Sequence, residues 1–454
     1  MIRSVSYLAR MRLYLIVGLQ CLTGSVSAAT DKTDQMIRLL SEHAANARQF
    51  DGTYRAAIAS RDAAWHAYRL AAAATGIKVI ASATSFYTDR TEESAAGQTS
   101  TSVQRSFAAN QVSVTAKKPL YRPRDIASVE QAYAQVQTAE ALLLSADYTL
   151  LGRVFLVWAE VMTARDQLQI AKETLLTVNR KRMETEKRLK AGEATIDQLG
   201  LEIARQRQRQ AEVFELQTRK ELAEQALADL AGPNALIPNS FTLDNAVPDR
   251  LAQITRGEIF QTIEERNPEL IAARFSEQAA LLEREKRNAD HSATVDIYAT
   301  ATRGENDTAV YIKDEMRLGV QLSLPLYTSG ALTAAVSQAD ADYQKMKAIT
   351  QATLARLKDR GNSAFGAVKS TTVKIDALNA LIQAAELHAE SIGRGVLAGV
   401  GSYGDLSRAE VELLEARRQR SNELLKFSQA WAALSVVTSR IDSIFERGLM
   451  LQPF

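Results

Sequence analysis

The sequence is poor in cysteine, proline, glycine and aromatic residues. Its 454 residues include 1 Cys, 8 Pro and 21 Gly, and 6% are aromatic. A single cysteine excludes a disulfide framework and a cluster of thiolate metal ligands. The scarcity of proline and glycine excludes a chain built of many tight turns. The composition is typical of long helices rather than of a compact α/β enzyme.

Motifs for catalysis or metal binding are also missing. The four histidines, His43, His66, His291 and His388, lie far apart and without the spacing of a metal site. Gly399–Gly404 matches G-x-G-x-x-G, but a long helical segment precedes it where a dinucleotide site needs a strand. We therefore interpret these glycines as a turn between helices, and we expect no enzyme activity, no cofactor and no metal.

Long apolar runs are missing except at the N-terminus. There, three arginines precede an apolar stretch from Leu13 to Leu22, and Val26-Ser27-Ala28 follows. This is the pattern of a secretory signal peptide. The stretch is shorter than the roughly 20 residues that a membrane-spanning helix needs. We expect residues 1–28 to be removed, and we expect no transmembrane helix in the rest of the chain.

The charge balance is close to neutral, with a formal net charge of +2. Loss of Arg3, Arg10 and Arg12 with the signal peptide would leave −1, so we expect no nucleic-acid partner. The only cysteine, Cys21, lies in the same segment. The residues before it match a lipidation signal poorly, which favours simple export.

What the sequence does contain is an internal repeat of about 207 residues. Pro119 and Tyr121 recur as Pro325 and Tyr327, and in both places alternating residues give way to a long helical pattern. Further pairs at this offset are Arg153 with Arg360, Trp158 with Phe365, and Gly192 with Gly399. Repeats of this length indicate that one arrangement of elements occurs twice.

Each repeat contains two stretches in which polar and apolar residues alternate, a pattern that predicts strands with one apolar face. The four stretches are 77–87, 112–117, 295–302 and 316–324. The first and the last have the roughly 9–11 residues that a tilted strand needs to cross a bilayer. We expect Leu318, Val320 and Leu322 to face lipid. The polar segments Thr88–Arg105 and Arg303–Glu315 are expected to be exposed loops.

Two very long helices are predicted after these strands. Arg124–Ala191 and Ser329–Ala398 contain no proline, and apolar residues recur along the first in heptad spacing. At 1.5 Å per residue, each helix would be roughly 100 Å long. A globular domain of this size cannot bury such helices, so we expect them to project and to pack on one another.

Four strands are too few to close a membrane barrel, which needs at least about eight because open edges are not tolerated in lipid. The barrel must therefore be shared between copies of the chain. Three copies would supply twelve strands, and two copies supplying eight also satisfy the count. In either case the outer-membrane lipid is an expected partner.

The export signal, the two repeats, the Pro-Leu-Tyr boundaries and the helix-hairpin turns together resemble the TolC family of outer-membrane efflux and secretion channels, over residues 40–445. The resemblance implies a mostly α fold with a small β part. Four strands per chain would form a shared transmembrane β-barrel, continued by a long periplasmic α-helical barrel. It also implies a homotrimer that conducts cargo passively from an inner-membrane transporter, through a periplasmic adaptor protein, to the outside.

The same resemblance places a periplasmic aperture at the far ends of the helices. Asp405 aligns with an acidic residue of the family's aperture segment, whereas Arg408 stands where the family has a second acid, and Asp197 lies near the equivalent place in the first repeat. The alternative is that Asp405 and Arg408 form an ordinary surface pair. The adaptor-contacting tips would contain Gly192, Glu193, Gly399, Val400 and Gly401.

The repeats also divide the chain. Prolines at 233, 238 and 248 mark a linker, and a helix is expected to restart after it and to run past Pro268 to about His291. The expected parts are a signal peptide (1–28), a first repeat (29–231), an inter-repeat linker in the equatorial region (232–256), a second repeat (257–445) and a C-terminal tail (446–454).

Two other classes of protein remain possible from the residues. A periplasmic coiled-coil adaptor also has helical hairpins, but it should carry a β-domain with glycine-rich strands, and the sequence shows none. A membrane-spanning enzyme barrel would need many more strands and a catalytic constellation. The sequence does not indicate the cargo.

Overall fold

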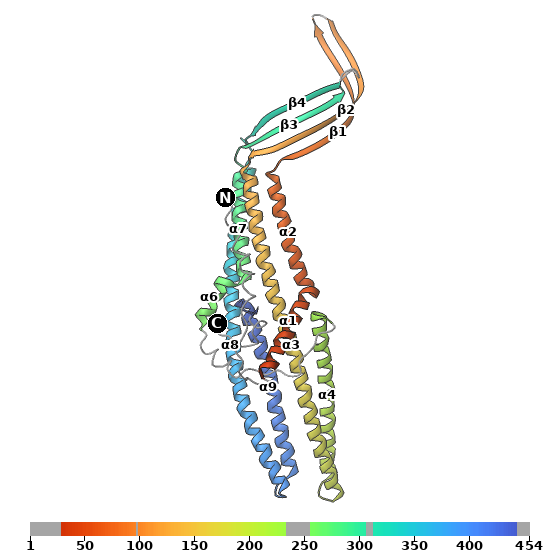
Figure 1. Ribbon diagram of the computed structural model, residues 1–454, viewed down its shortest axis with the longest axis vertical. Coiled ribbons are helices and arrows are strands. Elements are labelled where there is room, and N and C mark those ends of the chain that lie inside the picture. Colours follow the sequence, from red (N-terminus) through yellow and green to blue (C-terminus); the bar gives the residue numbers. More distant parts are fainter. Residues whose placement is uncertain (1–28, 97–98, 233–254, 306–311, 443–454) are drawn as a thin grey trace, which may run out of the picture.

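The computed structural model describes residues 29–96, 99–232, 255–305 and 312–442. Within them the chain is elongated, with a sheet at one end and helices running away from it (Figure 1). The helices are α1 (Ala29–Phe50), α2 (Gly52–Ala74), α3 (Pro123–Lys190), α4 (Ile196–Ala231), α6 (Arg256–Arg266), α7 (Pro268–Ala289), α8 (Ala331–Leu397) and α9 (Tyr403–Val437). The strands are β1 (Lys78–Ala96), β2 (Thr99–Tyr121), β3 (Thr294–Glu305) and β4 (Ile312–Ser323). The predicted fold class, mostly α with a small β part, is confirmed.

The four strands form one antiparallel sheet in the order β1-β2-β3-β4. The pairing aligns the alternating residues of all four strands. Val79 lies opposite Ala116, Ala116 lies opposite Ala299, and Ala299 lies opposite Leu318. One face of the sheet is therefore largely apolar from edge to edge. Val79 and Leu318 on this face are 65% and 74% exposed. An extended exposed apolar surface is what a membrane-facing sheet requires.

The opposite face of the sheet is mostly polar. The hydroxyl oxygens of Thr115 and Thr300 lie 3.2 Å apart across β2 and β3. Tyr298 lies opposite Gly319, and a Cβ at Gly319 would come within 2.8 Å of the tyrosine oxygen. The tyrosine therefore covers the glycine, an arrangement that compensates for a strand residue without a side chain.

The prediction of a loop at Thr88–Arg105 is wrong. β1 and β2 stay paired from Thr88 opposite Phe107 to Ala96 opposite Thr99, so the hairpin extends beyond β3 and β4 (Figure 1). Polarity alternates only where one face of a strand is apolar. A sequence in which nearly every residue is polar has no such pattern. The second predicted loop is shorter than expected, because its ends belong to β3 and β4 and only residues 306–311 lie outside the described residues.

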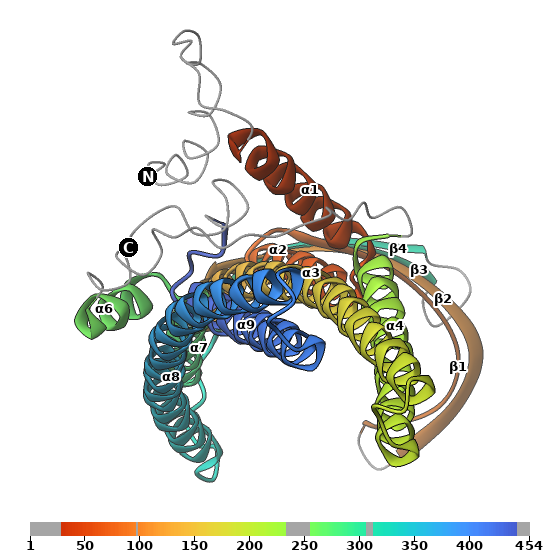
Figure 2. The same cartoon turned by 90° about the horizontal axis from the view of Figure 1, so that it is seen from below.

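The helices form a curved wall. Near the sheet, α2, α3, α7 and α8 lie side by side in that order, and at the far end the order is α4, α3, α9 and α8. Seen from below, the wall is an arc with α1 and α6 on its convex side and α9 on its concave side (Figure 2). The predicted long helices are confirmed within two residues at each end as α3 and α8.

The helix expected to run past Pro268 is two helices. α6 ends at Arg266 and α7 begins at Pro268, because Asn267 caps the new helix through its side-chain oxygen. Proline is favoured at the first helical position, where its missing N–H costs nothing. The chain can therefore turn at this point, and α6 leaves the wall while α7 enters it.

The hydrophobic core lies where α1 and α6 cover the wall. Phe155 and Trp158 of α3 and Phe427 of α9 are fully buried, together with Leu40 of α1 and Ile263 of α6. The repeat partner of Trp158, Phe365 of α8, belongs to the same cluster. The two repeats therefore meet in one core, although most of each long helix extends beyond it.

One described helix, α3, is long and apolar enough to cross a membrane by length and composition alone. It is part of the wall and contacts α1, α2, α4, α7 and α9 along its length. The expected signal peptide, most of the expected linker and the C-terminal tail lie outside the described residues.

Candidate functional site

The far ends of the two helical hairpins are built in the same way. Gly192 follows the end of α3 and Gly399 follows the end of α8, with φ angles of 77° and 78°. In each turn the next residue, Glu193 or Val400, donates its backbone N–H to a carbonyl of the last helical turn, at 2.8 and 3.0 Å. This Schellman pattern needs a left-handed residue, which favours glycine. The sequence interpretation of a turn between helices is confirmed.

The second tip is more tightly closed than the first. The N–H of Gly401 also donates to the carbonyl of Gly395, at 3.0 Å. A Cβ at Gly401 would lie 2.7 Å from the backbone nitrogen of Val396, so no other residue fits without a shift. Leu397 and Val400 beside it are 89% and 86% exposed. The tip thus presents apolar side chains at the extreme end of the molecule.

The three charged residues predicted for the aperture lie just beyond these tips. Asp405 is in the first turn of α9, and Asp197 is in the first turn of α4, where the helix dipole favours a carboxylate. Arg408 Nη1 lies 3.3 Å from Asp405 Oδ1, and both side chains are exposed. Within one chain these two residues therefore form the i,i+3 pair that their spacing allows, and Asp197 lies on another helix.

Polar contacts between the helices near the tips were not predicted. Thr177 and Arg180 of α3 donate to Glu410 Oε2 of α9, at 3.1 and 3.2 Å. This contact holds the second hairpin against the first. The available signal was the change of the α3 seam from apolar residues to Arg182 and Thr185, which indicates a polar rather than an apolar contact surface.

A buried carboxylate joins α3 to α4 at the same level. Glu202 of α4 is 6% exposed, and its Oε1 lies 3.1 Å from Lys181 Nζ of α3 and 2.8 Å from Arg205 Nη1. A buried carboxylate needs such partners, because removal from water otherwise penalises its charge. The lower wall is thus held by ion pairs as well as by apolar contacts.

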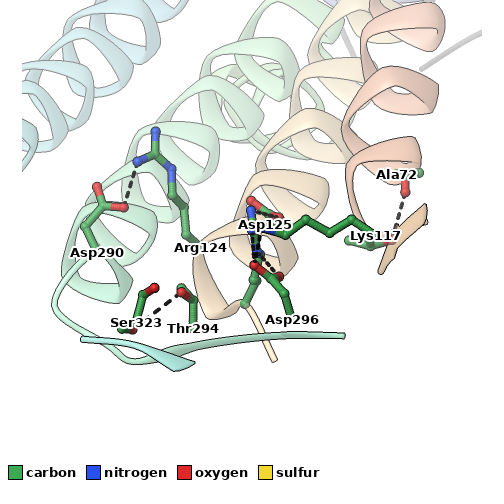
Figure 3. Close-up of polar contacts among 10 residues, drawn as sticks. Ala72, Lys117, Arg124, Asp125, Asp290, Thr294, Asp296 and Ser323 are labelled. Carbon is green, nitrogen blue, oxygen red and sulfur yellow. Dashed lines mark hydrogen bonds and ion pairs between the residues drawn. The ribbon is translucent and has the colours of Figure 1, made fainter. Parts of the chain in front are cut away.

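At the other end of the wall, a buried aspartate joins the sheet to the helices. Asp296 of β3 accepts two hydrogen bonds from the guanidinium of Arg122, at 2.7 and 2.6 Å, and Lys117 Nζ of β2 lies 2.9 Å from it. Its side chain is 5% exposed. Figure 3 shows Asp296 and Lys117 at the start of α3, with Arg124 pairing nearby with Asp290, the residue that follows α7. The strand–helix junction is therefore a charged cluster.

The predicted boundary residues lie at this junction. Tyr121 is the last residue of β2, and Pro119 lies where the β2–β3 register shifts. Pro325 and Tyr327 fall between the end of β4 and the start of α8. Proline cannot donate to a strand ladder, which suits the point where pairing ends.

The described residues hold no group of three or more His, Cys, Asp or Glu arranged to bind a metal ion. The geometry instead has the features of a wall. Its sheet has an apolar outer surface, its helices curve around an axis, and its two tips close in the same way.

Comparison with known proteins agrees with this geometry. The outer membrane efflux protein family matches residues 259–439. Proteases secretion protein PrtF of Dickeya chrysanthemi is 25% identical over 71% of this chain and 71% of its own length. Alkaline protease secretion protein AprF of Pseudomonas aeruginosa is 23% identical over 72% and 69%.

Solved structures show the same fold. The Campylobacter jejuni CmeC outer membrane channel has a TM-score of 0.75 at 13% identity, covering 96% of this chain and 98% of that channel. The Vibrio cholerae outer membrane protein VceC has a TM-score of 0.72 at 19% identity, covering 89% and 96%. The family match and the secretion-protein relatives favour a channel over a periplasmic adaptor. Together with the shared fold, they indicate the TolC family of outer-membrane channels and support an exit duct of the outer membrane with a periplasmic helical part.

Proposed function

We propose that three copies of this chain close into one continuous duct. The proposal rests on the two edges of the protomer, which match in the sheet, in the upper helices and in the lower helices. β1, α2 and α4 form one edge of the protomer, and β4 with α8 forms the other. One rotation about a single axis can therefore join sheet to sheet and helix to helix at every level.

Such an interface is heterologous, because each copy offers a different edge to each neighbour. A heterologous interface produces a ring when the rotation closes. Three copies give twelve strands, which is enough for a membrane barrel without open edges. The curvature of the helical wall in Figure 2 supports a helical tunnel below that barrel.

The tips are the proposed contact surface for a periplasmic adaptor protein, itself joined to an inner-membrane transporter. The exposed apolar side chains Leu397 and Val400 beside Gly399, together with Glu193 beside Gly192, support this placement. Bulky substitutions at Gly192 or Gly399 should abolish export while the ring still assembles. Normal export by such variants would place the adaptor elsewhere.

The same tips would form the resting aperture. Three copies of Asp405 would concentrate negative potential in a narrow ring, and Arg408 would partly neutralise it. In planar bilayers Asp405→Ala should shift ion selectivity, and Arg408→Asp should strengthen cation preference. Unchanged selectivity in both variants would show that the constriction lies elsewhere.

The cargo we propose is a protein, exported in one step from an inner-membrane transporter. The names of the protease secretion proteins PrtF and AprF, each matching about seven tenths of this chain, support this choice. The duct itself would conduct passively and without catalysis.

Single-channel recording tests the duct directly. Glu410→Ala removes the partner of Thr177 and Arg180, so α9 should move away from α3 more readily and the open fraction should rise. Glu412→Ala, two residues along and exposed, is the matched control and should behave like the unaltered channel. A purified protein that never conducts, or equal open fractions in both variants, would contradict the proposal.

A further inference from the structure

A groove lies between α3, α8 and α9 at the level where α9 ends. Its cavity volume is about 840 Å³. Its lining includes small and apolar residues, among them Leu156, Ala367 and Ala433. A volume of this size is typical of sites for small organic molecules, which lie in the range of about 300–1,000 Å³.

The lining of the groove also includes four cations and no carboxylate. They are Arg153, Arg360, Lys374 and Lys426. Arg153 and Arg360 are the pair that the internal repeat relates, so each repeat contributes one guanidinium to the same groove. A partly apolar lining that carries four cations is complementary to a molecule with an apolar body and a negative charge.

Neighbouring acids hold three of these cations in place from outside the groove. Arg153 Nη2 lies 2.9 Å from Asp51, Lys426 Nζ lies 2.7 Å from Glu423, and Arg360 Nη1 lies 4.0 Å from Glu269. A guanidinium has five N–H donors, so one such contact leaves donors for a ligand. Lys374 is exposed and makes no ion pair within the described residues.

The groove opens on the concave side of the wall. On α3 its lining residues Thr149, Arg153 and Leu156 lie on the face opposite the buried Val154 and Trp158, as the 100° step of a helix requires. Those buried residues pack beneath α1 and α6, which Figure 2 shows on the convex side. In a closed ring the groove would therefore face the lumen.

We propose that this cationic groove binds amphipathic organic anions, in which one carboxylate or sulfonate is attached to a compact apolar body. Its position in the lumen rests on the ring proposed above, whereas binding itself does not. Three grooves around one axis would form a band of twelve cations midway along an otherwise passive conduit. Bound anions would then narrow the conduit at that level.

Equilibrium binding to the purified full-length protein in lipid nanodiscs tests the site, with 2-naphthalenesulfonate as the probe. Methanesulfonate has the charge without the apolar body, and 2-naphthol has the body without the charge. Both should bind at least about tenfold more weakly, because each makes only half of the contacts. Equal binding of 2-naphthol and 2-naphthalenesulfonate would show simple partitioning and would overturn the proposal.

Variants on α8 locate the site. Lys374→Gln should weaken binding about fivefold, the scale of one partly exposed charge contact. Lys369→Gln is the matched control, because it removes the same charge from an exposed lysine outside the groove. Ala433→Trp should fill the groove and abolish binding. Equal effects of the two lysine changes, or unchanged binding by Ala433→Trp, would exclude this groove.

Channel recordings separate this inference from the ring. If the grooves face the lumen, 2-naphthalenesulfonate should reduce the current of the unaltered channel, and Ala433→Trp should remove that sensitivity. Binding without any effect on a conducting channel would contradict the lumenal position. Loss of conduction in every variant would count against the proposed duct. The binding measurement would then still show whether the groove binds the anion.

Discussion

Asn267 Nδ2 donates a 2.8 Å hydrogen bond to the carbonyl oxygen of Val437, which joins the start of α7 to the end of α9. The side-chain oxygen of the same asparagine accepts from the backbone N–H of Glu269 and Leu270, at 3.0 and 3.1 Å. One residue that is 4% exposed thus caps one helix and satisfies the end of another. It therefore allows α6 and α7 to form as two short helices where the sequence predicts one long helix.

Asn267→Ala should lower the free energy of unfolding by about 2–4 kcal/mol, because it removes the cap and leaves the Val437 carbonyl without its donor. Asn267→Asp keeps the cap acceptor but turns a buried carboxylate oxygen toward the Val437 carbonyl oxygen, so it should cost at least as much. Urea denaturation of the detergent-solubilised protein, followed by circular dichroism, measures both. Ser402→Ala removes only an exposed cap at the tip and should cost about 1 kcal/mol. A similar small loss for Asn267→Ala would show that the junction contributes little.

This junction shows what the sequence could and could not predict. The α3 and α8 helices are predictable because heptad spacing and the lack of proline are local signals. The sequence predicts one helix that runs past Pro268, and only the contact of Asn267 with Val437 shows why a new helix starts there. Similarly, Glu410 looks like any exposed acid in a helix until α3 is placed beside it.

The same limit applies to the sheet. Period-two spacing predicts which residues of β4 share a face, but the alignment of Leu318 with Ala299 and Val79 depends on register, which no single strand encodes. The polar part of the β1–β2 ribbon has no alternation to detect. Asp405 and Asp197 are proposed for the aperture from the resemblance to the family's aperture segment, and their proposed convergence would need other copies of the chain.

Asp296 should be the most sensitive polar residue of the strand–helix junction. Asp296→Asn removes the partner of Arg122 and Lys117, and breaking a buried ion pair on one side costs about 3–5 kcal/mol. Because both cations are partly exposed, we expect the lower part of that range. The temperature at which the folded barrel loses its heat-modifiable migration on a gel measures this effect.

The pair of Asp314 with Arg303 provides the control for this change. The Asp314 and Arg303 side chains are 70% and 69% exposed, and Arg303 Nε lies 3.6 Å from Asp314 Oδ1. Asp314→Asn should therefore change the free energy of unfolding by less than about 1 kcal/mol. Equal losses for Asp296→Asn and Asp314→Asn would mean that burial at the junction has no energetic role.

The apolar face of the sheet should not tolerate charge. Val320→Arg places a guanidinium toward lipid and should cost about 2–4 kcal/mol of barrel stability if the residue lies near the bilayer midplane. Gln321→Arg changes the adjacent residue, which faces the polar side, and should be tolerated. Urea-induced unfolding in liposomes compares the two. Equal destabilisation would show that the sheet does not separate lipid from a polar interior.

Acid should loosen the start of α2. Burial raises the pKa of Asp51, but hydrogen bonds from Thr53, Tyr54 and Arg153 outweigh it and hold the pKa below its ordinary value of 3.8. The folded state therefore favours the carboxylate. The resulting stability is present above the ordinary value and is lost as the pH falls through the lower, folded-state pKa. Asp51→Asn should make unfolding less dependent on pH below about 4. An unaltered pH profile in this variant would assign the acid sensitivity to other carboxylates.

Disulfide crosslinking between the sheet edges tests the shared barrel most directly. The only cysteine of the chain lies in residues 1–28, so pairs can be introduced freely. Ala81→Cys on β1 is combined in turn with a cysteine at Leu318, Val320 or Leu322 on β4, because the register between copies is open. A bond requires Cβ atoms about 3.5–4.5 Å apart. After oxidation in membranes, we predict that at least one combination gives covalent species of two and three chains and none larger, whereas each single cysteine gives no ladder. A ladder that stops at two chains or continues beyond three, or no crosslinking in any combination, would contradict a twelve-stranded barrel shared by three copies.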